Sequence, residues 1–451
     1  MKHVSKDGIV RECRAEKGRC PLEHFESVGE AERELEARYS QPLQKNKHEV
    51  TLEPNVEKAI AALSQAGKPY VVGGAVRDSF FGAENKDVDI EVHSTDLDSI
   101  TRELRKSGYS VDEVGRSFGV LKISGNGVRD LDVSVPRREN RVGAGHRDFE
   151  VDLSPMSVRE AAERRDFTFN AIMYDSENKK LVDPTGGAKD LNNGVMRHVS
   201  AKFKEDPLRT LRGFQFAGRF SMKYDPETAE MCKGLRGEYG SLPAERVSEE
   251  WRKFYTKSTD AKAGVKALQD SGWDDTEPGL RKALARDNTQ QSLQRLKNLP
   301  SDERHVQGIA ATTRSMNDEE ASSFRSRMSS SKAEAHQAAA LRKAESADLS
   351  TAEKRRWFAY ENSAFSFKRA SLYSGVVQDN KLRKASESAA NEGLADGPEK
   401  DLFNGTEVSE AAGKAPGPWM KPALDELRGL QYSRKVTTRE GLLAEASRRF
   451  K

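Results

Sequence analysis

The feature that most constrains this chain is an apolar run that ends at two adjacent glycines and is followed by two aspartates. Val72 precedes Gly73 and Gly74, and Asp87 and Asp89 come after a short gap. Glycine has no Cβ, so the backbone amides of such a turn can approach a phosphate closely. The segment after the glycines is expected to begin a helix, whose N-terminus favours anions. The sequence therefore predicts a strand, a phosphate-compatible turn and a helix, in that order.

The two aspartates are candidate catalytic carboxylates. Asp87 and Asp89 are two apart on an expected strand, so both side chains share one face. Adjacent like charges are costly unless a cation neutralises them, and carboxylate oxygens suit magnesium. Another strand of the same sheet could supply a third carboxylate, and Asp132 is the candidate, with Asp130 on the same face. A solvated strand would explain a lone Asp-x-Asp pair, but the preceding glycine turn favours two-metal phosphoryl transfer.

Hydrophobic periodicity divides the chain into a mixed first part and a helical second part. Up to about residue 199, strand-like and helix-like runs alternate, which is typical of a small α/β domain. The expected helices in this part are 30–39, 55–65 and 94–106, and the expected strands are 70–72, 87–93, 120–123 and 131–135. Further on, helices are expected at 205–220, 243–255, 261–271 and 279–285, then a helical stretch with unplaced ends, a linker at 388–400 and a helical unit at 421–450.

The composition limits the partners and the compartment that are expected for this protein. Lys plus Arg total 75 and Asp plus Glu total 72, so the net charge is +3 and any nucleic-acid surface must come from local basic clusters. The cysteines Cys13, Cys20 and Cys232 are too few for a disulfide framework and indicate a reducing compartment. Cys13, Cys20 and His24 form part of a possible zinc site, but no fourth ligand is evident nearby and the spacing fits no common zinc finger. No apolar run has the length of a signal peptide or a membrane span, so a soluble, cytoplasmic protein is expected.

The glycines and aspartates resemble the first motif of a known family. The stretch Gly73-Gly74-Ala75-Val76-Arg77-Asp78, then Gly82 and Asp87-Val88-Asp89, is similar to that motif in the class II tRNA nucleotidyltransferases and bacterial poly(A) polymerases. Phe80-Phe81 stands where the family usually has leucines. The predicted catalytic residues are then Asp87, Asp89 and Asp132, the first two as Mg²⁺ ligands, and the predicted nucleotide-binding residues include Gly73, Gly74 and Arg77.

A second stretch, Arg164-Arg165-Asp166-Phe167-Thr168-Phe169-Asn170-Ala171, resembles the family motif that holds the ribose and phosphates of the nucleotide. Adjacent arginines can pair with phosphate oxygens in a forked geometry, so Arg164 and Arg165 are candidates. Asp166 and Asn170 offer an acceptor and an amide to the ribose hydroxyls. A charged helix end that enters a buried Phe-x-Phe segment would explain these residues equally well.

A third stretch, Glu205-Asp206-Pro207-Leu208-Arg209 with Leu211-Arg212 after it, resembles the motif that reads the base. Asp206 and Arg209 are three apart and are expected on one face of a helix. In the family this pair hydrogen-bonds the base edge and substitutes for a template, and Arg212 is predicted to bind the nucleotide with them. An ion pair between Glu205 and Arg209, four apart, is the alternative.

Three other segments extend the resemblance. Asp183-Pro184-Thr185-Gly186-Gly187 is similar to a hinge between head and neck, although by itself it is only a Pro-Gly turn. The charged, glycine-bearing stretch from Arg137 to Phe149 is similar to the loop that the family links to the change from C to A. The stretch from Asp401, which includes Pro416-Gly417-Pro418-Trp419, is similar to a tail that grips the tRNA elbow.

Together these patterns predict an α+β protein with a small mixed β-sheet nucleotidyltransferase head and an all-helical neck, body and tail. The expected parts are an extension of unknown role at 1–45, the head at 46–199, the neck at 200–275, the body at 276–395 and the tail at 396–451. The predicted function is addition of CCA to the 3′ end of tRNA from CTP and ATP with Mg²⁺. A poly(A) polymerase, or an enzyme that adds only CC or only A, is the alternative, and the sequence does not indicate an oligomeric state.

Overall fold

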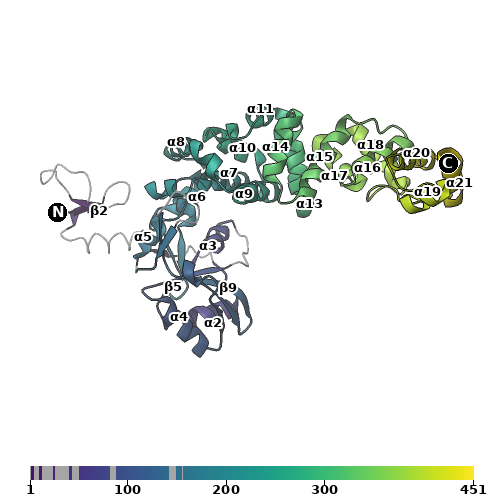
Figure 1. Cartoon of the computed structure of the whole chain (residues 1–451). Helices are drawn as coiled ribbons and strands as arrows, with labels where there is room; N and C mark the ends of the chain where they lie inside the picture. Colours follow the sequence, from purple (N-terminus) through teal and green to yellow (C-terminus); the bar gives the residue numbers. More distant parts are fainter. Residues whose placement is uncertain are drawn as a thin grey trace. The chain divides into compact units, whose positions relative to one another are not determined.

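The computed structural model describes residues 50–81, 88–141, 149–154 and 156–451, together with four short strands before residue 43. These residues form two compact units (Figure 1), one of residues 1–209 and 223–235 and the other of residues 210–222 and 236–451. In the described part of the chain, no helix is both long and apolar enough to cross a membrane.

The first unit is built on a mixed β-sheet whose strand order is β4-β13-β12-β5-β6-β9-β8-β7. The central strand β6 (Asp89–His93) pairs antiparallel with β5 (Lys68–Val72) and parallel with β9 (Val128–Ser134). All other neighbours in this sheet are antiparallel. The remaining strands are β4 (Ser40–Pro42), β7 (Ser110–Asp112), β8 (Val120–Gly125), β12 (Met173–Asp175) and β13 (Lys180–Val182). The parallel pair matters most, because it places the first residue of β6 beside β9.

Helices bury the apolar positions of this unit. Helix α2 (Pro54–Leu63) begins with a proline, which suits the first turn, and buries Ile60 and Leu63. Helix α4 (Leu97–Lys106) begins at Asp96, whose side chain accepts a hydrogen bond from the Ser99 amide at 2.8 Å. The other helices of this unit are α3 (Gly74–Ser79), α5 (Val158–Glu163), α6 (Gly187–Asn192) and α8 (Pro226–Gly234).

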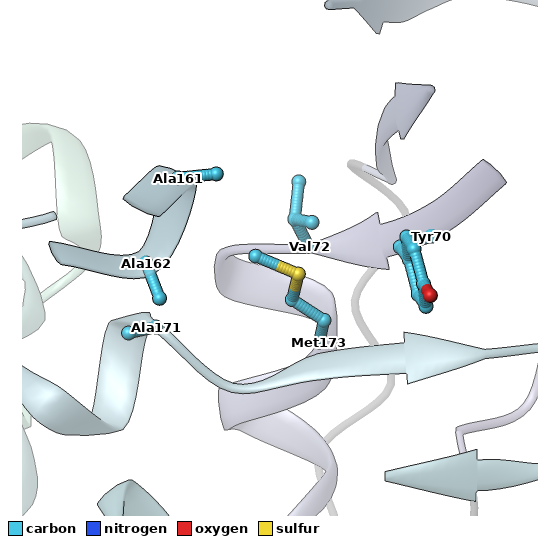
Figure 2. Packing of buried hydrophobic residues seen from close by; sticks show 6 residues of the cluster. All are labelled: Tyr70, Val72, Ala161, Ala162, Ala171 and Met173. Carbon is cyan, nitrogen blue, oxygen red and sulfur yellow. The ribbon is translucent and has the colours of Figure 1, made fainter. Parts of the chain in front are cut away.

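One buried cluster connects the sheet to the segment of the second predicted motif. Side chains of β5, α5 and β12 pack together in it (Figure 2), and its members are Tyr70, Val72, Ala161, Ala162, Ala171 and Met173. The three alanines are small, so α5 and the chain after Asn170 lie close to the sheet. The cluster thereby fixes the ends of the second motif against the strand that leads into the glycine turn.

A separate small sheet lies near the start of the chain. Its strands are β1 (Lys2–Val4), β2 (Val10–Glu12) and β3 (His24–Phe25), in the order β2-β1-β3. Both pairings are antiparallel. The helix predicted at 30–39 lies outside the described residues.

The second unit is helical. Its core includes Trp251, Phe254 and Tyr255 of α9 (Ala244–Lys257), which are almost completely buried. Gly308 is required there, because a Cβ at that position would lie 2.3 Å from the Tyr255 ring. The other helices are α7 (Leu208–Phe220, which begins in the first unit), α10 (Ala261–Asp270), α11 (Leu280–Leu284), α12 (Asp287–Arg295), α13 (Ser301–Thr313), α14 (Asp318–Met328), α15 (Lys332–Ser346), α16 (Ala352–Glu361), α17 (Phe367–Val377), α18 (Asn380–Asn391), α19 (Gly405–Ala412), α20 (Met420–Tyr432) and α21 (Arg439–Phe450).

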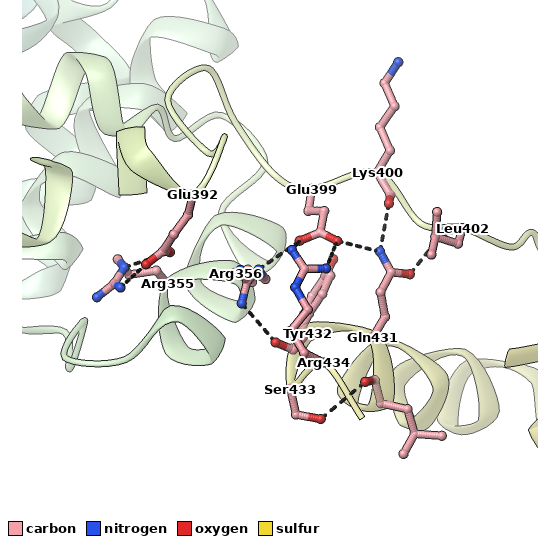
Figure 3. A network of polar contacts seen from close by, with 11 residues as sticks. Arg355, Arg356, Glu392, Glu399, Lys400, Leu402, Gln431, Tyr432, Ser433 and Arg434 are labelled. Carbon is pink, nitrogen blue, oxygen red and sulfur yellow. Dashed lines mark hydrogen bonds and ion pairs between the residues drawn. The ribbon is translucent and has the colours of Figure 1, made fainter. Parts of the chain in front are cut away.

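Within this unit, a polar network joins α16 to the segment around α20 (Figure 3). Arg356 is buried, pairs with Glu399 at 2.9 Å, and donates to the Tyr432 carbonyl at 3.1 Å. The ring of Trp357 meets the Tyr432 ring edge-on, with centroids 5.3 Å apart. Arg434 also pairs with Glu399, at 2.8 Å. The last helices are therefore fixed to α16 by charge and by aromatic packing.

The predicted α+β class is confirmed, as are most of the individual elements. The linker predicted at 388–400 is wrong at its start, because α18 continues to Asn391 and buries Ala389. The helical unit predicted at 421–450 is confirmed and consists of two helices, α20 and α21, and α19 precedes them. A short polar helix end with few large apolar residues explains the error at α18, since its pattern is weak.

Candidate active site

Two of the predicted carboxylates lie on neighbouring strands. Asp89 is the first residue of β6, and the parallel register pairs it with Asp132 of β9. Gly73, at the end of β5, has φ 72° and ψ −130°, a conformation that L side chains rarely adopt. A Cβ at Gly73 would lie 3.3 Å from Oδ2 of Asp89. The glycine turn thus passes directly beside a carboxylate oxygen, as expected from the sequence.

A lysine neutralises Asp132. Nζ of Lys122 lies 2.9 Å from Oδ1 of Asp132, and this hydrogen bond raises the pKa of Lys122. Asp130 has a φ of 51° beside an irregularity in the β8–β9 ladder, so the regular alternation of faces does not extend to it. Even so, Asp130 lines a cavity of about 640 Å³ together with Asp89 and Asp132.

Asp87 lies outside the described residues, as does Gly82. In the described ranges, no three His, Cys, Asp or Glu side chains are gathered closely enough to hold a metal ion. Asp89 and Asp132 nevertheless offer the hard oxygen donors that Mg²⁺ prefers, at registered positions beside a turn that has no Cβ. The donor atoms of these two residues are therefore of the kind that suits magnesium.

A second cavity, of about 400 Å³, brings acidic and basic side chains together. Its charged lining comprises Asp89, Glu91, Asp132, Arg137, Arg164, Arg165 and Arg209. This volume lies within the range of small-molecule sites. Arginines opposite a carboxylate pair can hold a polyphosphate while the carboxylates hold cations.

Glu91 is a site residue that the sequence analysis missed. It lies two residues after Asp89 on β6 and is buried. Its Oε1 lies 2.8 Å from Nε2 of His93, and its Oε2 lies 3.2 Å from Nη2 of Arg165. Burial alone would raise the pKa of this carboxyl, but Arg165 and His93 bring the pKa below its ordinary value. Glu91 is therefore a buried anion that holds Arg165 at the wall of the cavity. Its position two residues after Asp89, on the same face of β6, was the sequence pattern that could have identified it.

The predicted base readers, Asp206 and Arg209, lie at the start of α7, where the Arg209 amide donates to the Asp206 carbonyl at 3.0 Å. Asp206 precedes α7 and accepts a hydrogen bond from the Leu208 amide at 3.2 Å, so the expectation that Asp206 and Arg209 share one helical face is wrong. Arg209 donates to the Lys202 carbonyl at 2.8 Å and to the Arg164 carbonyl at 2.7 Å. Arg209 lines the cavity and also joins α7 to the second motif.

Glu205 pairs with Arg164 and not with Arg209, the partner considered from the sequence. Oε2 of Glu205 lies 3.8 Å from Nη2 of Arg164. The Arg164 side chain is only 16% exposed, so its guanidinium is held partly inside the cavity wall. The second and third predicted motifs are thus linked by side-chain and backbone contacts.

Three predicted nucleotide-binding residues form a buried network. Arg77 donates to Oδ1 of Asn170 at 2.9 Å and to Oδ1 of Asp78 at 2.7 Å. Asn170 in turn donates to Oδ1 of Asp166 at 2.9 Å. All four side chains are buried, and none of them lines the cavity. The network connects α3, which follows the glycine turn, to the second motif.

The predicted hinge motif forms a turn that supports the same segment. Asp183 accepts hydrogen bonds from the amides of Gly187 and Ala188, at 2.8 and 2.9 Å. A Cβ at Gly187 would lie 2.1 Å from the Thr168 carbonyl oxygen, so glycine allows α6 to touch the second motif.

Arg212 belongs to the second unit, where its guanidinium lies over the Phe216 ring. Residues 142–148 of the predicted loop lie outside the described residues.

The head resembles known nucleotidyltransferase domains. Residues 69–197 match the family model described as the poly A polymerase head domain. The Multifunctional CCA protein of Nitrosococcus oceani is 38% identical over 188 residues, which is 41% of this chain and 43% of that protein. The protein of the same name from Stenotrophomonas maltophilia is 37% identical over 210 residues, 45% of this chain and 49% of its own length. The chain thus aligns with less than half the length of these curated relatives.

The fold resembles solved structures over most of the chain. The Bacillus stearothermophilus CCA-adding enzyme in complex with CTP has a TM-score of 0.63 and 23% identity, and the match covers 88% of this chain and 98% of that chain. The Thermotoga maritima CCA-adding enzyme complexed with tRNA has a TM-score of 0.55 and 18% identity, with 88% and 95% covered. At these identities the match establishes the fold. The family resemblance read from the sequence is confirmed.

Proposed function

We propose that this chain is a cytoplasmic tRNA nucleotidyltransferase that adds CCA to the 3′ end of tRNA from CTP and ATP. The observation that carries the proposal is the registered pair Asp89 and Asp132 at a cavity that is also lined by Arg164, Arg165 and Arg209. The likeness of the head to Multifunctional CCA proteins and of the fold to CCA-adding enzymes supports the same reaction.

In the proposed reaction, the 3′ hydroxyl of the tRNA attacks the α-phosphorus of the nucleotide. A new ester bond forms, the bond between the α- and β-phosphates breaks, pyrophosphate leaves, and the hydroxyl proton passes to solvent. Arg164 and Arg165 bind the phosphates, because forked guanidinium groups match phosphate oxygens. Glu91 keeps Arg165 in place for this contact.

Asp87, Asp89 and Asp132 would hold magnesium. When bound there, it activates the attacking hydroxyl and offsets the charge on the departing pyrophosphate. Lys122, whose Nζ lies 2.9 Å from Oδ1 of Asp132, offsets the charge of this carboxylate. The glycine turn leaves room for a phosphate beside Asp89.

Asp206 and Arg209 are proposed to read the base edge. Cytosine and adenine both present an amino donor beside a ring-nitrogen acceptor, which a carboxylate and a guanidinium can match. Arg209 lies on the cavity and is tied to the Arg164 carbonyl, which supports a role in joining base selection to phosphate binding. Arg209→Ala should reduce the preference for CTP and ATP over UTP and GTP by about 1–3 kcal/mol, the cost of an unpaired polar group. Full preference in that variant would show that the base is read elsewhere.

The decisive experiment supplies a tRNA transcript that lacks its CCA end with CTP and ATP together and resolves the products on a sequencing gel. Products that end at CCA support the proposal. Long A tails on unrelated RNAs indicate a poly(A) polymerase instead, and products that stop at CC with ATP in excess indicate a CC-adding enzyme. Asp89→Asn serves as the matched inactive control, because it keeps the size of the side chain and removes its charge.

A further inference from the structure

The turn between β7 and β8 exposes an aromatic ring to solvent. This turn contains the short helix η1 (Arg116–Phe118), and Phe118 is 61% exposed. Val114, in the same turn, is 88% exposed. A single exposed apolar side chain is ordinary on a protein surface. Whether Phe118 has a role therefore depends on what lies beside it.

Ion pairs and backbone hydrogen bonds fix this turn. The Arg116 guanidinium donates to Asp98 of α4 at 2.6 Å and to Glu113 at 2.8 Å. The Phe118 amide donates to the Gly115 carbonyl at 2.9 Å. A ligand that binds a side chain on a fixed segment loses little free energy to ordering of the protein. The turn therefore presents Phe118 in one place before any ligand binds.

Phe118 lies at the rim of the arginine-lined cavity of the candidate active site. Nη1 of Arg137 donates to the Phe118 carbonyl at 2.5 Å. The next residue, Gly119, accepts a hydrogen bond at its carbonyl from the Val135 amide at 3.1 Å. Arg137, Val135 and Val120 all line the cavity, whereas Phe118 does not belong to its lining. The ring is thus held directly outside the cavity, on a segment that forms part of its wall.

The cavity suits one nucleotide, so a second ligand is needed to reach Phe118. Four arginines of the cavity match the phosphates of an incoming nucleotide, and its volume of about 400 Å³ is near the lower end for small-molecule sites. The other substrate of the proposed reaction is the 3′ end of an RNA strand, which must meet the nucleotide at this cavity. Unpaired bases of RNA are the groups that aromatic side chains bind by stacking.

The chemistry of the turn favours a base over other occupants. Arg105 and Arg116 pair with Glu113, and Arg116 also pairs with Asp98, so the turn offers a ring rather than a cation. A protein interface usually buries about 800 Å² on each partner, far more than one ring and one valine can provide. A flat, apolar ring with paired charges around it matches the face of a nucleobase.

We propose that Phe118 stacks on an unpaired base near the 3′ end of the acceptor RNA, an inference that rests on the proposed function. Stacking does not depend on the identity of the base, because every base has a π-face. An enzyme that adds C, C and then A presents a different terminal base at each step, and a ring accepts all of them. Phe118 binds the acceptor and takes no part in making or breaking bonds.

The test uses the full chain and a tRNA transcript that lacks its CCA end and carries 2-aminopurine as its last base. Stacking quenches the fluorescence of this base, so wild type should quench it on binding without any nucleotide. Phe118→Ala should lose this quenching and bind the probe about 5–150-fold more weakly, which corresponds to about 1–3 kcal/mol for one stacked base. In CMP incorporation, KM for the tRNA should rise by a similar factor, while KM for CTP at saturating tRNA stays the same.

Phe118→Tyr should keep both quenching and affinity, because it keeps the ring, whereas Phe118→Leu should keep neither. Val114→Ala is the matched control from the same exposed turn and should change nothing. Wild-type quenching and affinity in Phe118→Ala or in Phe118→Leu would overturn the proposal. A wild-type protein that quenches the probe but extends no RNA would contradict the proposed function and leave the stacking contact supported.

Discussion

Replacing Glu91 by glutamine tests whether a buried charge positions the phosphate-binding arginines. Glu91→Gln keeps the size of the side chain and one acceptor oxygen but removes the negative charge between His93 and Arg165. The Glu91 side chain is 12% exposed and the Arg165 side chain is 22% exposed. Water therefore screens this pair only in part, and the substitution leaves a mostly buried guanidinium without its counter-charge.

The expected cost follows from that geometry. Removing one partner of a fully buried ion pair costs about 3–5 kcal/mol. The partial exposure of Arg165 and the hydrogen bond that glutamine retains reduce this to about 1–3 kcal/mol, the range for an unsatisfied buried polar group. If this cost is lost from the stabilisation of the transition state, kcat/KM for CTP should fall by about 5–150-fold, at about tenfold per 1.4 kcal/mol. The loss should appear mainly as a higher KM, because Arg165 binds phosphate in the ground state as well.

The assay is CMP incorporation by wild type, Glu91→Gln, Arg165→Gln and the double variant. A double-mutant cycle should give a coupling of about 0.5–3 kcal/mol, because the two side chains are in contact. Glu177→Gln, at an exposed turn position of the same unit, should have no effect. Additive single effects, or a Glu91→Gln enzyme with wild-type kcat/KM, would refute the positioning role.

The pH dependence gives a second check on Glu91. Because its pKa in the folded protein lies below the ordinary value of 4.5, its ionised form stabilises the fold. This contribution is complete above that ordinary value and is lost as the pH falls through the lower folded pKa. The difference in unfolding free energy between wild type and Glu91→Gln should therefore be constant near neutral pH and shrink in acid.

Three other substitutions test the site and the second unit. Asp89→Asn should lower kcat by about a thousandfold or more, since it removes a proposed metal ligand, while tRNA affinity in a filter-binding assay stays the same. Gly73→Ala should destabilise the first unit by about 1–3 kcal/mol in urea unfolding, because Gly73 has a φ of 72°. The same substitution should slow catalysis, because the added Cβ would lie beside Asp89. Gly240→Ala, where a Cβ meets nothing within 4 Å, should be neutral. Arg356→Met should speed hydrogen exchange in α20 by roughly 5–150-fold, as expected for a loss of about 1–3 kcal/mol. Unchanged exchange there would show that the Glu399 network does not hold the last helices.

Local patterns in the sequence predicted the parts of the site that depend on neighbours along the chain. The Gly73 turn, the strand that begins at Asp89 and the helix after Gly74 all follow from apolar spacing and from the conformational freedom of glycine. A shared sheet for Asp89 and Asp132 was also predicted, but their direct pairing on adjacent strands was not.

Contacts between distant segments could not be predicted in this way. Arg77 was predicted to bind the nucleotide, and its buried hydrogen bond to Asn170, 93 positions away, was not foreseen. Glu91 and Arg165 are 74 positions apart, and neither pattern alone indicates the other. The roles of Asp87, Arg164 and the other predicted ligands stay predictions until the substitutions are made.

The network around Arg356 has a consequence for anyone who wishes to exchange the C-terminal end between related proteins. A graft that begins at residue 396 would carry Glu399 and Tyr432 but leave Arg356 and Trp357 with the host. The charged and aromatic side chains on the grafted segment and on the host would then each face a surface that does not match them. A segment that can be exchanged without breaking these contacts begins before α16. In a chimaera, the C-terminal end should therefore be exchanged together with the helix against which it packs.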